Sequence, residues 1–204
     1  MSEPAGFPSA TVRGFLDQVA ARTPAPGGGA SCAFAAGTAA ALVAMSARFS
    51  TKQLPDAERV AATADDLRGE ALPLAEADAE AYGKLLAAFR DKEPGHRERL
   101  AEACRAACDV PLRIAGVAAA VAELAARVGT DGNPNLRGDA YTAAMLCSAA
   151  AESAVALVRI NVRAGGLDDE PERRAGAHTL AVARAVEAMR ETLGPPSASA
   201  PEQA

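Results

Sequence analysis

Three consecutive glycines are the first feature of this sequence that could bind a ligand. Gly27, Gly28 and Gly29 follow two prolines and precede a long run of small apolar residues. Consecutive glycines leave backbone N–H groups free to face a ligand, and a helix N-terminus favours an anion. No Gly-Lys-Ser/Thr follows, and no strand precedes, so this is neither of the common nucleotide-binding loops. We interpret the segment as a loop of close approach to a ligand, with a flexible connector as the alternative.

A carboxylate and a phenol share one face of a later helical stretch. Asp78 and Tyr82 are four residues apart, and Leu74 and Leu85 fall on the same side. A carboxylate directed toward apolar neighbours is unfavourable unless it has a partner or a function. A solvated carboxylate on a charged helix is the alternative, because Glu80 lies nearby.

A polar loop precedes the most apolar helical stretch of the chain. Asn133 and Asn135 lie in a Gly/Pro-rich segment, and Asp139 begins the helix that follows. Loops held by a rigid scaffold often carry function. These residue types also form ordinary turns, and Asp139 would serve as an ordinary helix N-cap.

Two further polar residues are candidates for substrate contacts. Asn161 stands between Arg159 and Arg163 near the end of this apolar helix, and Lys52 is an isolated cation after the glycine-led helix. Basic residues in the last turn suit the helix dipole, and they are equally able to bind a carboxylate.

The sequence predicts a series of helices separated by segments that contain proline and glycine, and these helices position the candidate residues. Ser9 is the candidate N-cap of the first helix, and Gly165-Gly166 ends the fifth. No segment alternates as a strand does. We expect an all-α bundle of about six helices in one domain, 1–193, and a Pro/Ser/Ala-rich disordered tail, 194–204. The expected helices span 9–22, 29–50, 55–92 with a kink at Pro73, 96–128 with a bend near Pro111, 139–164 and 171–193.

Composition narrows the class of protein. The 204 residues include 54 alanines, 3% are aromatic, and the net charge is −5. Alanine favours helix over strand. A nucleic-acid binder would show a basic balance and stacking aromatics. The N-terminus has no basic and apolar leader pattern, so we expect a cytoplasmic protein. The four cysteines are scattered and indicate neither a disulfide framework nor a metal site.

The stretches 29–50 and 139–164 are nearly uncharged and rich in small residues. Side chains this small gain little from transfer to lipid, so we expect buried helices rather than membrane spans. A chain of this length has too few other residues to cover both helices. We therefore expect a homodimer.

Taken in order, three motifs resemble one family. Pro-Ala-Pro-Gly-Gly-Gly-Ala precedes an Ala-rich helix, Asp-Ala-Glu-Ala-Tyr follows in the next, and Gly-Asn-Pro-Asn-x-x-x-Asp precedes another. The chain resembles the cyclodeaminase/cyclohydrolase family, which acts on one-carbon derivatives of tetrahydrofolate. The resemblance spans about 12–193.

The resemblance implies a helical homodimer with a folate cleft near the subunit interface. It assigns catalysis to Asp78, Asp139 and Lys52, with either aspartate as the acid/base. It assigns substrate contacts to Gly27, Gly28, Gly29, Tyr82, Asn133, Asn135 and Asn161. It implies hydrolysis of 5,10-methenyltetrahydrofolate, or cyclisation of 5-formiminotetrahydrofolate with release of ammonia, without a metal or other cofactor. Gly138 stands where the family usually has Ser, and Leu157 where it often has Asn. An inactive folate-binding or structural dimer is the alternative.

Overall fold

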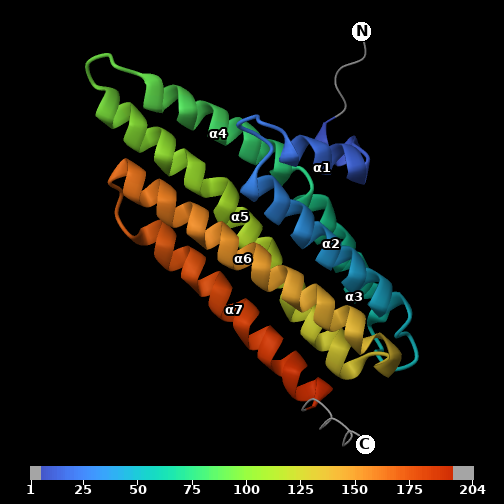
Figure 1. Ribbon diagram of the computed structural model, residues 1–204. Helices are drawn as coiled ribbons and strands as arrows, with labels where there is room; N and C mark the ends of the chain where they lie inside the picture. The colour runs from blue at the N-terminus through green and yellow to red at the C-terminus, as the bar shows by residue number, and fades with distance from the viewer. Residues whose placement is uncertain (1–5, 195–204) are drawn as a thin grey trace, which may run out of the picture.

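The computed structural model describes residues 6–194, and within them every regular element is helical. Figure 1 shows an elongated bundle in which the long helices run side by side. This confirms the predicted all-α fold. The elements are a 3-10 turn at Phe7–Ser9, α1 (Val12–Ala20), α2 (Gly28–Arg48), α3 (Ala57–Ala71), α4 (Leu74–Arg90), α5 (His96–Asp131), a 3-10 turn at Pro134–Leu136, α6 (Arg137–Gly165) and α7 (Glu170–Leu193).

The core lies where α5 and α6 pack along their length, with α2 and α7 against them. Alanines dominate it, including Ala33, Ala40, Ala118 and Ala144, each with no exposed surface. Alanine combines the best helix propensity with the smallest side chain that still excludes water, so helix axes approach closely. The many alanines of the sequence therefore form the closely packed helix contacts in the core of this bundle.

The segment predicted as a single helix over 55–92 forms two helices. α3 ends at Ala71 and α4 begins at Leu74, with Pro73 as its N-cap. Proline has no N–H to bond the carbonyl four residues earlier and its ring crowds that turn. The expected kink is in fact a break between two helices.

Other predicted boundaries held within a few residues. Thr11 caps α1, because its side chain accepts a hydrogen bond from the Gly14 N–H at 3.0 Å. Ser9 was the wrong choice of cap, since it belongs to the preceding 3-10 turn. Gly166, at φ +60°, ends α6 in the left-handed region that favours glycine. The predicted tail from 195 onward lies outside the described residues.

All four cysteines are buried free thiols, in agreement with the structural role expected for them. Two segments in the described part of the chain, Gly28–Arg48 and Pro134–Gly165, are long and apolar enough to cross a membrane by length and composition alone. Buried helices in soluble bundles pass the same test. Protein atoms cover 61% and 44% of these two segments, so each keeps an exposed side.

Candidate active site

A cavity of about 450 Å³ opens between the α1–α2 loop, α4, α5 and α6. This size falls within the roughly 300–1,000 Å³ of small-molecule sites. Its wall is mostly apolar, and its polar groups are the glycine-loop backbone, Asp78, Tyr82 and Asn161. The full lining is Pro24, Ala25, Gly27, Gly28, Gly29, Asp78, Ala81, Tyr82, Leu85, Phe89, Ala107, Pro111, Leu157, Ile160, Asn161 and Ala164.

The carboxylate of Asp78 lies directly against the first turn of α2. A Cβ placed on Gly29 would overlap the Asp78 carboxylate, so glycine is what permits this approach. The Pro-rich segment before Gly27 cannot remain helical, which starts α2 at this point. The predicted loop of close approach therefore contacts a carboxylate of its own chain, and both border the cavity.

Two opposing influences act on the Asp78 carboxyl. Burial raises its pKa because the charged form loses water, and a hydrogen bond from the Ala30 backbone N–H lowers it. Burial is the stronger effect, and the pKa of Asp78 lies above its ordinary value of 3.8. A carboxyl of this kind is suited to both accepting and donating a proton.

Tyr82 and Asn161 complete the polar part of the wall. Tyr82 lies one turn beyond Asp78 on α4 and remains 41% exposed. Asn161 is buried on α6, and its amide nitrogen donates to the Ala107 carbonyl at 2.9 Å. The nitrogen is thus committed to α5, which leaves the amide oxygen as the acceptor available to a ligand.

A second group of predicted residues lies at the other end of α2. The Asn133 side chain accepts from the Asn135 N–H at 3.1 Å and donates to the Phe49 carbonyl at 3.2 Å. The Asn133 N–H also donates to the hydroxyl of buried Ser50 at 2.9 Å. These bonds tie the α5–α6 loop to the end of α2. Asn133 therefore has a structural task here, whatever else it does.

Asp139 and Lys52 belong to the same end of the bundle. Asp139 is half-buried in the first turn of α6, which begins at Arg137. The expected N-cap role was therefore wrong, because Leu136 occupies the cap position. Lys52 is exposed in the turn after α2.

One chain does not bring the ten predicted residues together. α2 has 21 residues, so at 1.5 Å per residue its two ends are about 31 Å apart. Gly27, Gly28, Gly29, Asp78, Tyr82 and Asn161 line the cavity at its start. Lys52, Asn133, Asn135 and Asp139 are at its far end. The structure thus places the predicted residues in two separate groups, which we term half-sites.

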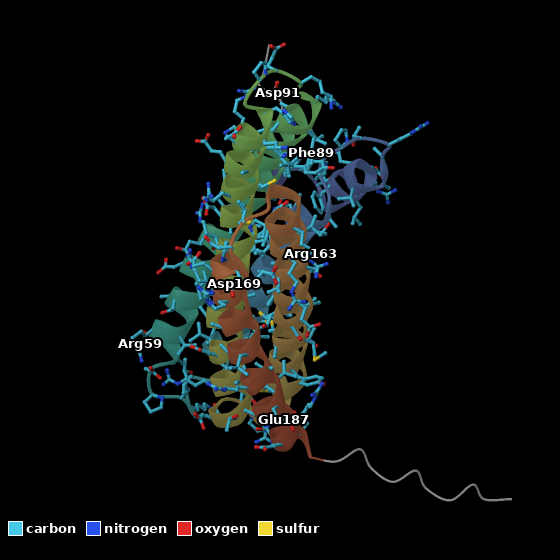
Figure 2. All side chains as sticks on the ribbon, turned by 90° about the vertical axis from the view of Figure 1, so that its left-hand side faces the viewer. Arg59, Phe89, Asp91, Arg163, Asp169 and Glu187 are labelled. Carbon is cyan, nitrogen blue, oxygen red and sulfur yellow. The ribbon has the colours of Figure 1, made fainter. Side chains whose placement is uncertain are left out.

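Several cavity residues were not anticipated from sequence. Ile160 and Ala164 stand on α6 at the spacing of one helix face with Leu157 and Asn161, and Phe89 and Pro111 close other sides. The i, i+3, i+4, i+7 spacing was the available signal, but it is shared with any buried helix face. Among the flanking arginines, Arg159 pairs with Glu172 at 3.4 Å, and Arg163 points to the exterior, where Figure 2 labels it.

Comparison with known proteins identifies the family of this chain. The sequence profile of the formiminotransferase-cyclodeaminase family matches residues 11–179. The chain belongs to this family. It is 32% identical over 171 residues to a methenyltetrahydrofolate cyclohydrolase of Methylorubrum extorquens, covering 78% of this chain and 81% of that protein.

The fold is also that of a solved family structure. Formiminotetrahydrofolate cyclodeaminase from Thermotoga maritima superposes with a TM-score of 0.81 at 28% sequence identity. The match covers 91% of this chain and 96% of that one. The resemblance found in three short motifs is therefore a family membership that extends over the bundle.

The described residues contain no group of three or more His, Cys, Asp or Glu side chains placed to hold a metal ion.

Proposed function

We propose that this protein is a folate one-carbon enzyme that hydrolyses 5,10-methenyltetrahydrofolate to 10-formyltetrahydrofolate. Family membership and the name of the Methylorubrum relative supply the substrate class. The observation that carries the proposal is Asp78, a carboxyl with a raised pKa held against a glycine helix start at the wall of an apolar cavity. That arrangement suits proton transfer to and from a ring-shaped, largely apolar substrate.

In the proposed reaction, water adds to the methenyl carbon and Asp78 accepts the proton that water releases. The bond between this carbon and N5 then breaks, and N5 takes the electron pair and a proton. The formyl group remains on N10, and one proton is released overall. The same carboxyl serves as base and then as acid, which a raised pKa favours.

The remaining predicted residues take binding roles in this scheme. Asp139 accepts hydrogen bonds from the adjacent N–H donors of the pterin, and Lys52 polarises the reacting group or binds the glutamyl tail. The backbone at Gly27–Gly29 approaches the substrate, and the Asn161 amide oxygen accepts a hydrogen bond. This chemistry requires no metal or redox cofactor.

Cyclodeamination is the second candidate reaction, and the similarity to the Thermotoga cyclodeaminase favours it. There N10 attacks the formimino carbon carried on N5, the tetrahedral carbon forms between the two nitrogens, and ammonia leaves. Both reactions pass through a carbon bonded to N5 and N10, so Asp78 is placed to act in each. In cyclodeamination it accepts the proton that N10 releases and protonates the departing ammonia.

The proposed enzyme is a homodimer formed through the exposed side of α2 and α6. The surface positions on this side are mostly small or apolar: Ser31, Ala35, Thr38, Leu42 and Met45 on α2, and Met145, Ala149, Ser153, Ala156 and Ile160 on α6. Glu152 is the one charged position among them, and its carboxylate accepts a hydrogen bond from the Ser148 hydroxyl. A two-sided stripe of small and apolar residues about 31 Å long is typical of a subunit interface. The stripe also explains why α2 and α6 resemble membrane helices, and we propose that a second copy covers it rather than lipid.

A two-fold axis across the middle of this face would unite the half-sites. α2 and α6 run antiparallel, because the start of α2 meets Asn161 while its end meets Asn133. A partner related by two-fold symmetry runs in the reverse direction, and its far end faces the cavity. Lys52, Asn133, Asn135 and Asp139 of the partner subunit then complete the site that begins with Asp78. With net charge −5 and 3% aromatic residues, we place this dimer in the cytoplasm without a nucleic-acid partner.

An inactive folate-binding or structural dimer is the alternative from another class. Leu157 in the cavity wall and Gly138 beside Asp139 motivate it, since the family often has polar residues at both positions. Nothing lies within 4 Å of a Cβ at Gly138, so Ser would fit there without rearrangement. If the wild type is inactive and Gly138→Ser is active, the absence of a hydroxyl at position 138 is the cause of the inactivity.

One set of assays distinguishes the three functions. Methenyltetrahydrofolate and formiminotetrahydrofolate are each mixed with wild-type protein, Asp78→Asn and Glu80→Gln, the last being an exposed carboxylate on the same helix. Enzyme-accelerated loss of the methenyl absorbance supports hydrolysis, and its appearance with ammonia supports deamination. Asp78→Asn should lose about 10²- to 10⁴-fold in rate and Glu80→Gln none. A fully active Asp78→Asn contradicts the proposed acid/base role of Asp78. An inactive wild type favours the inactive folate-binding or structural dimer.

A further inference from the structure

The short helix α1 stands apart from the rest of the bundle. Figure 2 shows it projecting sideways, on the same side as α6 and Arg163. It is attached to its own chain through half-buried Val19 and through Phe15, which contacts Phe7 and Phe34 with ring-centre distances of 6.4 and 4.2 Å. A nine-residue helix is too short to be stable by itself in water. The protomer alone therefore holds α1 weakly.

The apolar face of α1 extends beyond Phe15 to two side chains that the protomer leaves uncovered. Val12 is 78% exposed and Leu16 is 58% exposed, one turn apart on a single face. A second large apolar side chain, Phe49, is 67% exposed just past the other end of α2. These exposed apolar side chains lie at the two ends of the exposed face of α2 and α6. Exposed apolar groups of this kind indicate a surface that binds a partner.

The two-fold arrangement in the proposed dimer brings these groups together. α1 lies at the Gly28 end of α2 and Phe49 at the Arg48 end, about 31 Å away by helix rise. Antiparallel pairing of the two copies places the start of one α2 beside the end of the other. Val12 and Leu16 of one subunit then reach the partner subunit's Phe49.

The area of the proposed interface also indicates that α1 binds the partner subunit. Two helices of this length, spaced as packed helices are, present about 600 Å² per subunit. A stable specific interface needs about 800 Å² per partner, and permanent homodimers bury more. A projecting apolar helix at each end supplies the missing area.

We propose that α1 is an intersubunit clamp, whose Val12 and Leu16 pack on the partner subunit's Phe49 and hold the composite cleft closed. This rests on the dimer in the proposed function. The clamp has a functional consequence, because the chain between α1 and α2 forms the Pro24–Gly29 wall of the cavity. Docking of α1 on the partner fixes the glycine loop against the substrate, so assembly and site formation are coupled.

Cross-linking tests this contact directly. The variant Leu16→Cys with Phe49→Cys cannot form a bond within one chain, since a disulfide needs Cα atoms within about 7 Å. We expect a covalent dimer on mild oxidation. Gln18→Cys with Phe49→Cys is the matched control, because Gln18 lies on the other side of α1 and should cross-link poorly. The wild type, with its four buried thiols, should not cross-link.

Each outcome decides a separate point. A dimer by sedimentation that gives no cross-link overturns the clamp and leaves the dimer. A monomer overturns both. A covalent dimer without folate activity supports the clamp and contradicts the proposed reaction. As a second measurement, Val12→Ser with Leu16→Ser should weaken dimerisation at least tenfold, since both side chains are exposed in the protomer and are not needed to fold it. Unchanged dimer affinity in this variant would also overturn the clamp.

Discussion

Asp78 is the residue whose environment differs most clearly from that of a solvated surface carboxylate, which was the alternative interpretation of its sequence context. Its position beside the positive end of α2 would by itself stabilise the charge. Burial against Gly29 outweighs that effect, and the pKa of Asp78 rises. The residue type and its helical face followed from sequence, but the competition between burial and the Ala30 N–H needed coordinates.

This raised pKa predicts a pH dependence of stability. A carboxyl whose pKa is higher in the folded state favours folding below its unfolded pKa, near 3.8, and this contribution is lost as pH rises through the folded value. Asp78→Asn should therefore unfold at higher urea than the wild type at pH 7 and at the same urea near pH 3. Urea midpoints at both pH values check this. A variant less stable than wild type at pH 7 would show that the carboxylate is favourably paired.

At the scale of elements, the sequence predicted which segments are helical and where proline and glycine interrupt them. The Pro24–Gly29 segment separates two helices as expected, whereas Pro73 separates α3 from α4 where only a kink was expected. Both effects come from a missing N–H and a fixed φ, which are local properties. The exact caps at Thr11 and Leu136 were missed, since several neighbouring residues could serve. The antiparallel course of α2 and α6, which separates the half-sites, depends on tertiary packing that no local signal encodes.

The glycine start of α2 provides a matched pair of substitutions. Gly29→Ala should destabilise the fold by about 1–3 kcal/mol, because the new methyl group overlaps the Asp78 carboxylate. It should also lower activity by displacing that group. A Cβ at Gly28 meets no protein atom within 4 Å, so Gly28→Ala should leave the stability of the fold unchanged. Thermal unfolding of both variants tests the contact, and equal stability of the two would argue against it.

At the scale of the whole molecule, the exposed side of α2 and α6 is the dominant feature. Family membership and the helical fold could be read from three motifs, whereas the division of the site could not. A single chain places Asp78 and Asp139 near opposite ends of α2. The proposed dimer rests on this separation as much as on the largely apolar face of α2 and α6.

An arginine in the middle of this face should prevent assembly. Thr38 is exposed near the centre of α2, where the two-fold axis would bring it close to its own copy. Thr38→Arg then places two like charges in an apolar interface, which costs several kcal/mol. Sedimentation should show a folded monomer with little activity. Ala177→Arg, on the exposed side of α7, should leave the assembly unchanged. A dimeric Thr38→Arg would place the interface elsewhere.

The most direct test of the composite folate site is a subunit-mixing experiment. Asp78→Asn and Asp139→Asn are each expected to be nearly inactive alone. When they are unfolded and refolded together in equal amounts, half of the dimers carry one of each chain, and one of the two sites in such a dimer is intact. The account predicts recovery of about a quarter of wild-type methenyltetrahydrofolate hydrolysis. No recovery, in a mixture shown to contain heterodimers, would contradict it.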